Sequence, residues 1–249
     1  MNHFFDIDDI GSLELALARA QSIKAQPEKG YTKGNHKSIG LLFFNPSLRT
    51  RLSSQRAAQN LGMDVVVLDV GSESWKLEFS DGKIMNGASA EHIKEAAGVM
   101  GAYFDFLAIR AFASLQDRDL DYAEPVLTSF MKHAGVPIIN MESSTGHPLQ
   151  AFADLITIDE FKKTERPKVV LSWAPHPRAL PHAVANSFAQ WMNRAPVDLI
   201  ITHPEGYELD PKFVGSARVE TNQFLAFEGA DFIYACLLYT SDAADELSC

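Results

Sequence analysis

At 249 residues, of which 46% are apolar and 22% charged, the chain is long enough to bury one large core or two smaller ones, and we expect two domains. Its net charge of −10 excludes a broad basic surface for nucleic acid and argues against an anionic membrane as a partner. A small anion bound at one site remains compatible with this charge.

Apolar runs of strand length alternate along the chain with segments of helical period. Strands are expected at residues 38–44, 64–70, 104–109, 136–141, 168–174, 197–202 and 231–235. Helices are expected at about residues 12–25, 48–61, 91–100, 120–134, 148–163, 181–193 and 222–229, several of them ending at a glycine such as Gly62, Gly101 or Gly135. Strands that are apolar on both faces and separated by helices predict an α/β fold with doubly wound parallel sheets.

The helix at 148–163 precedes a second series of strands, and we interpret it as the link between two α/β domains. We place a first domain at residues 1–146 and a second at 147–235, with residues 236–249 as a separate tail. In such sheets ligands bind where strands end and helices begin. The acidic start of the chain and the absence of an apolar run of roughly 20 residues predict a cytoplasmic protein.

A first candidate site follows the strand at 38–44, where the sequence reads NPSLRTR. Ser47 is expected at the N-cap of a helix with Arg49, Thr50 and Arg51 in its first turn, where backbone N–H groups and the helix dipole favour an anion. Cations are disfavoured in a first turn, so the two arginines need a compensating negative group such as a phosphate. Solvated arginines after an ordinary serine cap explain the same letters, and the motif alone does not decide between these interpretations.

Two further strand ends offer polar groups. Arg110 ends the strand at 104–109, and the sequence ESSTGHPLQ at 142–150 follows the strand at 136–141. A neutral His147 can donate to a carbonyl oxygen and Gln150 can accept from an amide N–H, which suits a ligand that carries both groups. Each of these residues also has an ordinary structural explanation, but three such strand ends together favour one shared pocket.

Together, residues 47–51 (SLRTR), Arg110 and residues 147–150 (HPLQ) resemble the carbamoyl-phosphate signature of the aspartate and ornithine carbamoyltransferases. Two further stretches, WKLE at 75–78 and WAPHPRALPHAVANSFAQWM at 173–192, resemble the branch of this family that acts on N2-acylated ornithine. The resemblance extends from the first helix to residue 235.

The resemblance implies two small-molecule substrates and neither a metal nor a cofactor. It assigns carbamoyl phosphate to Ser47, Leu48, Arg49, Thr50, Trp75, Arg110, His147 and Gln150. Glu142 and His176 match positions that contact the acylornithine, although without the resemblance they read as a helix-entry acid and a loop histidine. The family also implies a homotrimer in which Trp75 reaches the site of a neighbouring subunit.

The implied reaction transfers a carbamoyl group to the side-chain amine of N-succinyl-L-ornithine, giving N-succinyl-L-citrulline and phosphate in arginine biosynthesis. Among the implied catalytic residues, Thr50, Arg110 and His147 would face the developing oxyanion and Arg49 the leaving phosphate. Ala90 stands where the acetyl-preferring enzymes have a glutamate, so it would admit a second carboxylate without repelling it. N-acetylornithine is the alternative substrate.

The sequence departs from the family after residue 235. Cys236 stands where the family has a substrate-binding lysine, and the tail CLLYTSDAADELSC contains neither the family's H-C-L-P motif nor its last helix. We therefore expect a C-terminally truncated member, and an inactive remnant that binds carbamoyl phosphate or phosphate is a further alternative.

Other classes of enzyme fit less well. A nucleotide-dependent enzyme is disfavoured because no glycine-rich phosphate loop occurs, and a metal hydrolase because His176 and His182 have no acidic cluster beside them. The two cysteines, Cys236 and Cys249, predict neither a disulfide framework nor a thiolate metal site.

Overall fold

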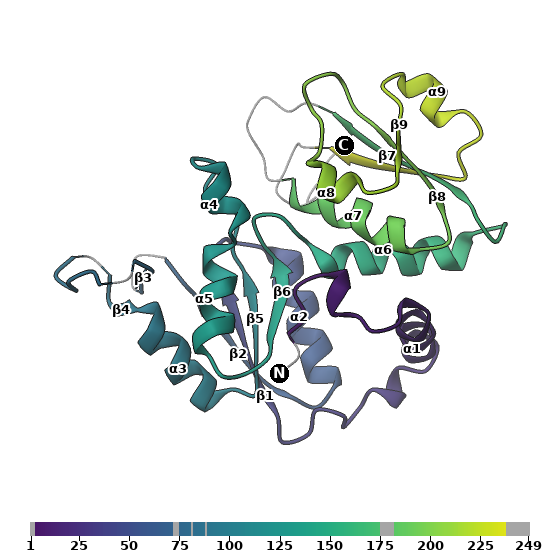
Figure 1. Ribbon diagram of the computed structural model, residues 1–249. Helices are drawn as coiled ribbons and strands as arrows, with labels where there is room; N and C mark the ends of the chain where they lie inside the picture. Colours follow the sequence, from purple (N-terminus) through teal and green to yellow (C-terminus); the bar gives the residue numbers. More distant parts are fainter. Residues whose placement is uncertain (1–2, 72–74, 81, 88, 175–181, 238–249) are drawn as a thin grey trace.

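The structure, a computed structural model, describes residues 3–71, 75–80, 82–87, 89–174 and 182–237. They form two α/β units, each built on a parallel four-stranded sheet, and helix α6 (Pro148–Phe161) leads from the first unit along the second (Figure 1). The predicted α/β fold with two parallel sheets is thereby confirmed. Within the described residues, no helix is long and apolar enough to cross a membrane.

The first sheet has the strand order β2-β1-β5-β6 and is parallel throughout. Its strands are β1 (Ser38–Phe43), β2 (Asp64–Asp69), β5 (Phe106–Arg110) and β6 (Ile138–Glu142). The central strands β1 and β5 are almost wholly buried, which explains why their sequences are apolar at successive positions rather than at alternate ones.

Helices cover both faces of this sheet. They are α2 (Leu48–Asn60), α3 (Ile93–Tyr103) and α5 (Pro125–His133), and the short helix α4 (Arg118–Tyr122) precedes α5 in the chain. Helix α2 packs on β1 and β2 over a core that includes Leu41 and Phe43, while α3 and α5 pack together on the opposite face over Leu42 and Leu107. The short strands β3 (Leu77–Glu78) and β4 (Glu91–His92) form a ribbon that projects beyond α3 (Figure 1).

The second sheet has the order β10-β7-β8-β9. Its strands are β7 (Lys168–Ala174), β8 (Asp198–Thr202), β9 (Arg218–Val219) and β10 (Phe232–Leu237). Its other elements are α7 (Ala183–Arg194), α8 (Pro211–Val214) and α9 (Gln223–Phe227). Helix α7 is buried between α6 and this sheet, with Phe188 and Trp191 in the core.

The N-terminal segment connects the two units. Phe4 forms a parallel bridge with Ile139 at the edge of β6, and Ile7 is buried in the core of the second unit. This segment contains α1 (Leu13–Ala25), which lies against α6, and two 3-10 helices, Ile7–Asp9 and Pro27–Lys29. The N-terminal segment is therefore a second connection between the two units, in addition to α6.

The strand order determines where a ligand is expected. The chain passes from β1 to β2 on one side and returns to β5 on the other, so the order reverses between β1 and β5. Ligands of open α/β sheets bind at such a reversal, outside the carboxyl ends of the strands. In the second sheet the reversal lies between β7 and β10, and the segments that follow them, 175–181 and 238–249, lie outside the described residues.

In the first sheet, the register between β5 and β6 shifts by one residue at the carboxyl ends of these strands. Ile109 pairs with Asn140, whereas Arg110 pairs with Glu142, so Met141 is passed over. The Met141 side chain is buried in the apolar core under α2. The shift therefore places a carboxylate, rather than a thioether, beside Arg110.

Two expectations about helices are wrong. The helix expected at 120–134 is two helices, α4 and α5, separated at Glu124. Pro125 disfavours helical backbone in the residue before it, and Glu124 adopts a φ of 50°. Gly101 does not end a helix, since it lies inside α3 where a Cβ would come within 1.7 Å of the Ala134 carbonyl oxygen. Gly62 does follow the end of α2 with a φ of 82°.

Several short elements carry no sequence signal. Helix α8 and strands β3, β4 and β9 are too short to show a period, and none of them was expected. Strand β10 runs two residues past the boundary expected at residue 235, and Cys236 pairs with Trp173 in the second core. The first two residues of the expected tail therefore belong to the second sheet.

Candidate functional site

The first turn of α2 follows β1 and has the predicted serine cap. Ser47 is the N-cap, and its Oγ accepts a hydrogen bond from the Thr50 backbone N–H at 3.2 Å. Arg51 turns away to form an ion pair with Asp69 on β2 and lies over the Phe43 ring at 4.6 Å. Only one of the two expected guanidinium groups, that of Arg49, therefore faces the cavity described below.

Arg110 at the end of β5 is completely buried. Its Nη1 donates to Thr50 Oγ1 at 2.8 Å and forms an ion pair with Glu142 Oε2 at 2.7 Å. Its guanidinium group also stacks on the Phe112 ring at 4.5 Å. Three elements, α2, β5 and β6, thus meet at this one side chain, as expected for residues at one edge of a parallel sheet.

His147 joins the same cluster from the start of α6. Its Nε2 lies 3.5 Å from Glu142 Oε2, and the residue is 6% exposed. Burial, helped by the positive charge of Arg110, lowers the pKa of His147 to about 3. The imidazole is therefore neutral at physiological pH and offers one N–H donor and one acceptor.

Gln150 lies one turn into α6 with a defined orientation. Its Nε2 donates to Asp154 Oδ1 at 2.9 Å, which leaves its carbonyl oxygen as the group that can accept from a ligand. Burial raises the pKa of Asp154 to about 6. No side chain caps the first turn of α6, in contrast to that of α2, so its backbone N–H groups favour an anion.

A cavity of about 510 Å³ lies between the first turns of α2 and α6. Five of the predicted residues line it, namely Leu48, Arg49, Thr50, His147 and Gln150. Arg110 and Glu142 do not line it but lie directly behind Thr50 and His147. The sequence did not single out Leu52, Ser53 and Ser54, which line the cavity from the second turn of α2 because of the helical repeat alone.

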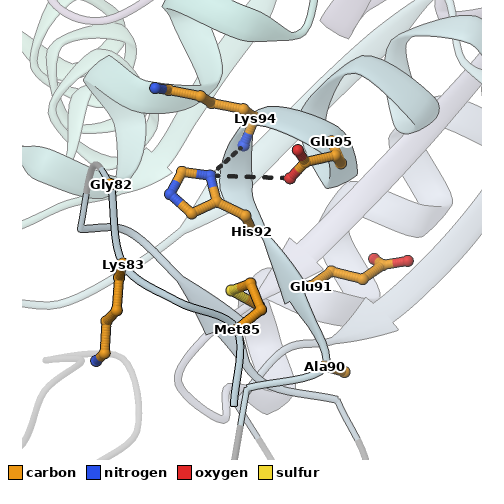
Figure 2. A pocket seen from close by; sticks show the side chains of 8 residues that line it. All are labelled: Gly82, Lys83, Met85, Ala90, Glu91, His92, Lys94 and Glu95. Atoms are coloured by element: carbon orange, nitrogen blue, oxygen red, sulfur yellow. Dashed lines mark hydrogen bonds and ion pairs between the residues drawn. The ribbon is translucent and has the colours of Figure 1, made fainter. Parts of the chain in front are cut away.

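Two predicted residues lie elsewhere, and the structure does not place a third. Trp75 is half-buried against the first core, and its Nε1 donates to Glu91 Oε2 at 3.2 Å. Ala90 is exposed and lines a second cavity of about 510 Å³, shown in Figure 2, in the loop around β4. His176 lies outside the described residues. Glu142 is 2% exposed as the partner of Arg110, so its expected contact with an acylornithine stays a prediction.

The geometry suits a small ligand with a phosphate group and a carbonyl group. Arg49 and the N-terminus of α2 supply positive potential on one side of the first cavity, and on the other side the N-terminus of α6 carries a neutral imidazole and an amide. Among the described residues, no group of three or more His, Cys, Asp and Glu side chains is placed to hold a metal ion.

Known proteins share this sequence and fold. Residues 2–160 match the family described as aspartate/ornithine carbamoyltransferase, carbamoyl-P binding domain. The chain is 56% identical to the N-succinylornithine carbamoyltransferase of Bacteroides fragilis (strain 638R), over 97% of this chain and 77% of that protein. It is 37% identical to the N-acetylornithine carbamoyltransferase of Xanthomonas axonopodis pv. citri (strain 306), over 94% of this chain and 73% of that protein.

Solved structures agree. An acetylornithine transcarbamylase complexed with acetylcitrulline matches with a TM-score of 0.87 and 37% identity, over 97% of this chain and 76% of that one. A variant of N-acetyl-L-ornithine transcarbamylase complexed with carbamyl phosphate and N-succinyl-L-norvaline matches with a TM-score of 0.88 and 36% identity, over 97% of this chain and 76% of that one.

Proposed function

Because the chain belongs to the aspartate/ornithine carbamoyltransferase family, in its N-acylornithine branch, we propose that it transfers the carbamoyl group of carbamoyl phosphate to the side-chain amine of N-succinyl-L-ornithine. The products are N-succinyl-L-citrulline and phosphate, and the reaction belongs to arginine biosynthesis. The higher identity to relatives named for the succinyl substrate than to those named for the acetyl substrate supports this choice of acyl group.

The observation that carries the proposal is a set of buried polar nitrogen atoms that have no partner among the described residues. Nε and Nη2 of Arg110 and Nδ1 of His147 are buried and have no hydrogen-bond partner in the described part of the chain. Each buried group of this kind costs about 1–3 kcal/mol when it stays unpaired. A polar ligand bound beside Thr50 and His147 accounts for their retention.

Each predicted residue then has a chemical role. Arg49 and the first turn of α2, with Ser47 and Leu48, hold the phosphate. The neutral substrate amine attacks the carbamoyl carbon to form a tetrahedral intermediate, and the phosphate leaves when this intermediate collapses and takes up the amine proton. Thr50, Arg110 and His147 donate to the oxygen that becomes negative in the tetrahedral intermediate. The Nε2 of Gln150 donates to Asp154, so the Gln150 carbonyl oxygen accepts a hydrogen bond from the carbamoyl NH2.

The acylornithine is assigned to the second domain and to the loop around β4. We place the carbamoyl-phosphate domain at residues 1–146 and the acylornithine domain at residues 147–235, with Glu142 and His176 contacting the acylornithine. Ala90 offers a short uncharged side chain at the second cavity (Figure 2), which supports a substrate with an additional carboxylate.

We further propose a cytoplasmic homotrimer in which Trp75 closes the carbamoyl-phosphate site of a neighbouring subunit. Trp75 lies just before β3 and donates to Glu91 on β4, and it does not line the cavity between α2 and α6 of its own chain, which supports this arrangement. Sedimentation analysis of the chain and of Trp75→Ala tests the trimer, and mixed trimers of Trp75→Ala and Arg49→Gln subunits test whether the site is shared.

The function is tested by two measurements on the same chain. Titration calorimetry with carbamoyl phosphate reports binding, and a colorimetric assay for the ureido product reports turnover with N-succinylornithine, N-acetylornithine or ornithine. We expect binding that Arg49→Gln abolishes, and product from N-succinylornithine in preference to the other two. Product from plain ornithine alone would overturn the branch, and binding without product from any amine would overturn the transferase activity.

A further inference from the structure

Glu124, which the sequence did not single out, has an unusual backbone. It lies between α4 and α5 with φ 50° and ψ 55°, the left-handed conformation that side chains other than glycine adopt rarely. It is 5% exposed, and its side chain does not cap α5. Such strain costs on the order of 1 kcal/mol or more and persists where the surroundings require it.

The Glu124 carboxylate binds three successive residues of another loop. Its Oε1 accepts from Ser143 Oγ at 2.7 Å, from Thr145 N at 2.7 Å and from Thr145 Oγ1 at 2.6 Å. Its Oε2 accepts from Ser144 N at 3.2 Å. The residues bound are twenty positions downstream, so the left-handed turn serves to aim the carboxylate at them.

The loop that Glu124 binds is the segment between β6 and α6, residues 143–147, and it is buried. Loops usually lie on the surface because buried backbone groups need partners that irregular segments do not supply. Glu124 supplies acceptors for two of these backbone N–H groups, those of Ser144 and Thr145. Without this carboxylate the two groups would be buried and unpaired, unless the loop moved.

The same loop leads directly into His147. Ser143 closes the turn by donating its N–H to the Gly146 carbonyl at 2.8 Å. From the other side, Ser187 Oγ on α7 accepts the His147 N–H at 2.7 Å, and Asn186 Nδ2 donates to the Thr145 carbonyl at 3.2 Å. The backbone of His147 is therefore held between Glu124 of the first unit and α7 of the second.

Side-chain contacts in the described chain do little to orient the ring of His147. Its Nδ1 has no hydrogen-bond partner in the described chain, and its Nε2 is 3.5 Å from Glu142, which is long for a hydrogen bond. The imidazole is thus oriented by the position of its own main chain. A shift of the loop would move it relative to Arg110 and to a bound ligand.

We propose that Glu124 is a positioning residue for carbamoyl transfer: through residues 143–146 it fixes the main chain of His147 and so aims the imidazole at the carbamoyl group. This inference rests on the proposed function for its consequence in activity, but the geometry of the loop itself can be tested without turnover.

The test uses Glu124→Gln in the full chain, with Thr145→Val as a second variant. The glutamine keeps the volume and one oxygen but places an NH2 group opposite a backbone N–H donor. The valine removes only the Thr145 hydroxyl. The control is Asp121→Asn, because Asp121 is also a buried carboxylate, 7% exposed, that accepts two backbone N–H groups, from Ser114 and Leu115, in a different loop.

The readout that does not require turnover is the NMR signal of the His147 ring during a pH titration, assigned with a His147→Gln chain. In the parent and in Asp121→Asn the ring stays neutral down to about pH 4, whereas in Glu124→Gln we expect it to titrate closer to the ordinary value near 6.5. We also expect Glu124→Gln to lower the affinity for carbamoyl phosphate by about tenfold, as for other residues that orient ligand-binding groups. Thr145→Val should lower this affinity by less.

A folded Glu124→Gln chain with an unchanged His147 titration would overturn the proposal. If that variant fails to fold, an unchanged titration in Thr145→Val overturns it instead, and an equal change in Asp121→Asn shows general destabilisation and also overturns it. If the parent chain has no transferase activity but Glu124→Gln still changes the His147 titration, the positioning of His147 is supported and the proposed function is refuted. Failure of the positioning role and failure of the proposed function are therefore distinguishable.

Discussion

Side chains are held differently in the buried cluster at the wall of the first cavity and around the second cavity. In the cluster of Arg110, Glu142 and His147, each side chain is at least nine-tenths buried and contacts another at 2.7–3.5 Å. In the loop cavity around Ala90, the lining side chains are mostly exposed, and Lys83 and Glu91 point outward from its rim (Figure 2). The first lies at the ends of long strands, the second on two-residue strands.

This difference in burial suits two different functions, stabilisation of charge and choice of the acyl group. Stabilising charge in a transition state requires donors that do not move during the reaction, which burial and close packing provide. Choosing an acyl group requires a pocket that can change by one residue without affecting the core, which an exposed loop allows. Mutations should therefore be able to change the rate of carbamoyl transfer and the preference for an acyl group independently of each other. The following experiments test this independence.

The largest effect is expected at Arg110. Arg110→Gln should lower kcat by about 10³-fold, because it removes donors to the developing oxyanion. It should also destabilise the fold by about 3–5 kcal/mol, because it leaves the buried Glu142 carboxylate unpaired. Denaturant unfolding and steady-state kinetics measure the two effects. Adding Glu142→Gln should restore much of the stability but none of the activity, and restored activity would contradict the assigned role.

The pH dependence of stability should report His147. Its pKa is about 3 in the folded chain and near 6.5 when unfolded, so the unfolded chain binds one more proton between these values. Stability is therefore fully present above about pH 6.5 and falls by up to about 1.4 kcal/mol per pH unit as pH decreases. Urea unfolding between about pH 7 and pH 4 measures this slope. In His147→Gln the free energy of unfolding should depend less steeply on pH. An unchanged slope would contradict the burial of a neutral His147 ring.

The loop cavity should control acyl preference without affecting stability. Ala90→Glu should reduce kcat/KM for N-succinylornithine relative to N-acetylornithine by about 10- to 100-fold, because a second carboxylate would be repelled at short range. Ala90→Gln is the matched control for bulk without charge. Competition assays with both substrates measure the ratio. Equal effects of both variants would attribute the preference to size, and no effect of either would remove Ala90 from the site.

The smallest effect is expected at Arg51. Its ion pair with Asp69 is partly exposed, with 29% and 55% of the two side chains accessible, so Arg51→Gln should cost only about 0–1 kcal/mol. Carbamoyl-phosphate affinity should hardly change, whereas Arg49→Gln should abolish measurable binding. Calorimetry on the two variants compares them directly. Equal losses would show that both guanidinium groups hold the phosphate.

Local patterns were sufficient for much of this structure. Strand β7 has the predicted limits, and Ser47 caps α2 as expected, because burial of a strand and capping of a helix depend on neighbouring residues. The sequence also identified five residues that line one cavity. It did not show that Arg51 would be paired with Asp69 on another strand.

Other features depend on residues far apart in the chain. The pairing of Arg110 with Glu142 results from a register shift, and Glu124 contacts a loop twenty positions away. Neither relation leaves a periodic signal, because both arise from how strands and loops meet in three dimensions. The same is true of Gly101, whose neighbour Ala134 is on the connection after α5.

The passed-over Met141 has a consequence for how this segment can vary between related chains. Surface connections commonly gain or lose residues without harm. Loss of one residue between Glu142 and His147, accommodated by straightening this bulge, would instead pair Met141 with Arg110, bring an apolar side chain next to a buried guanidinium group, and turn the carboxylate to the other face of the sheet. We therefore expect the number of residues from Asn140 to His147 to be as strictly limited as their identities.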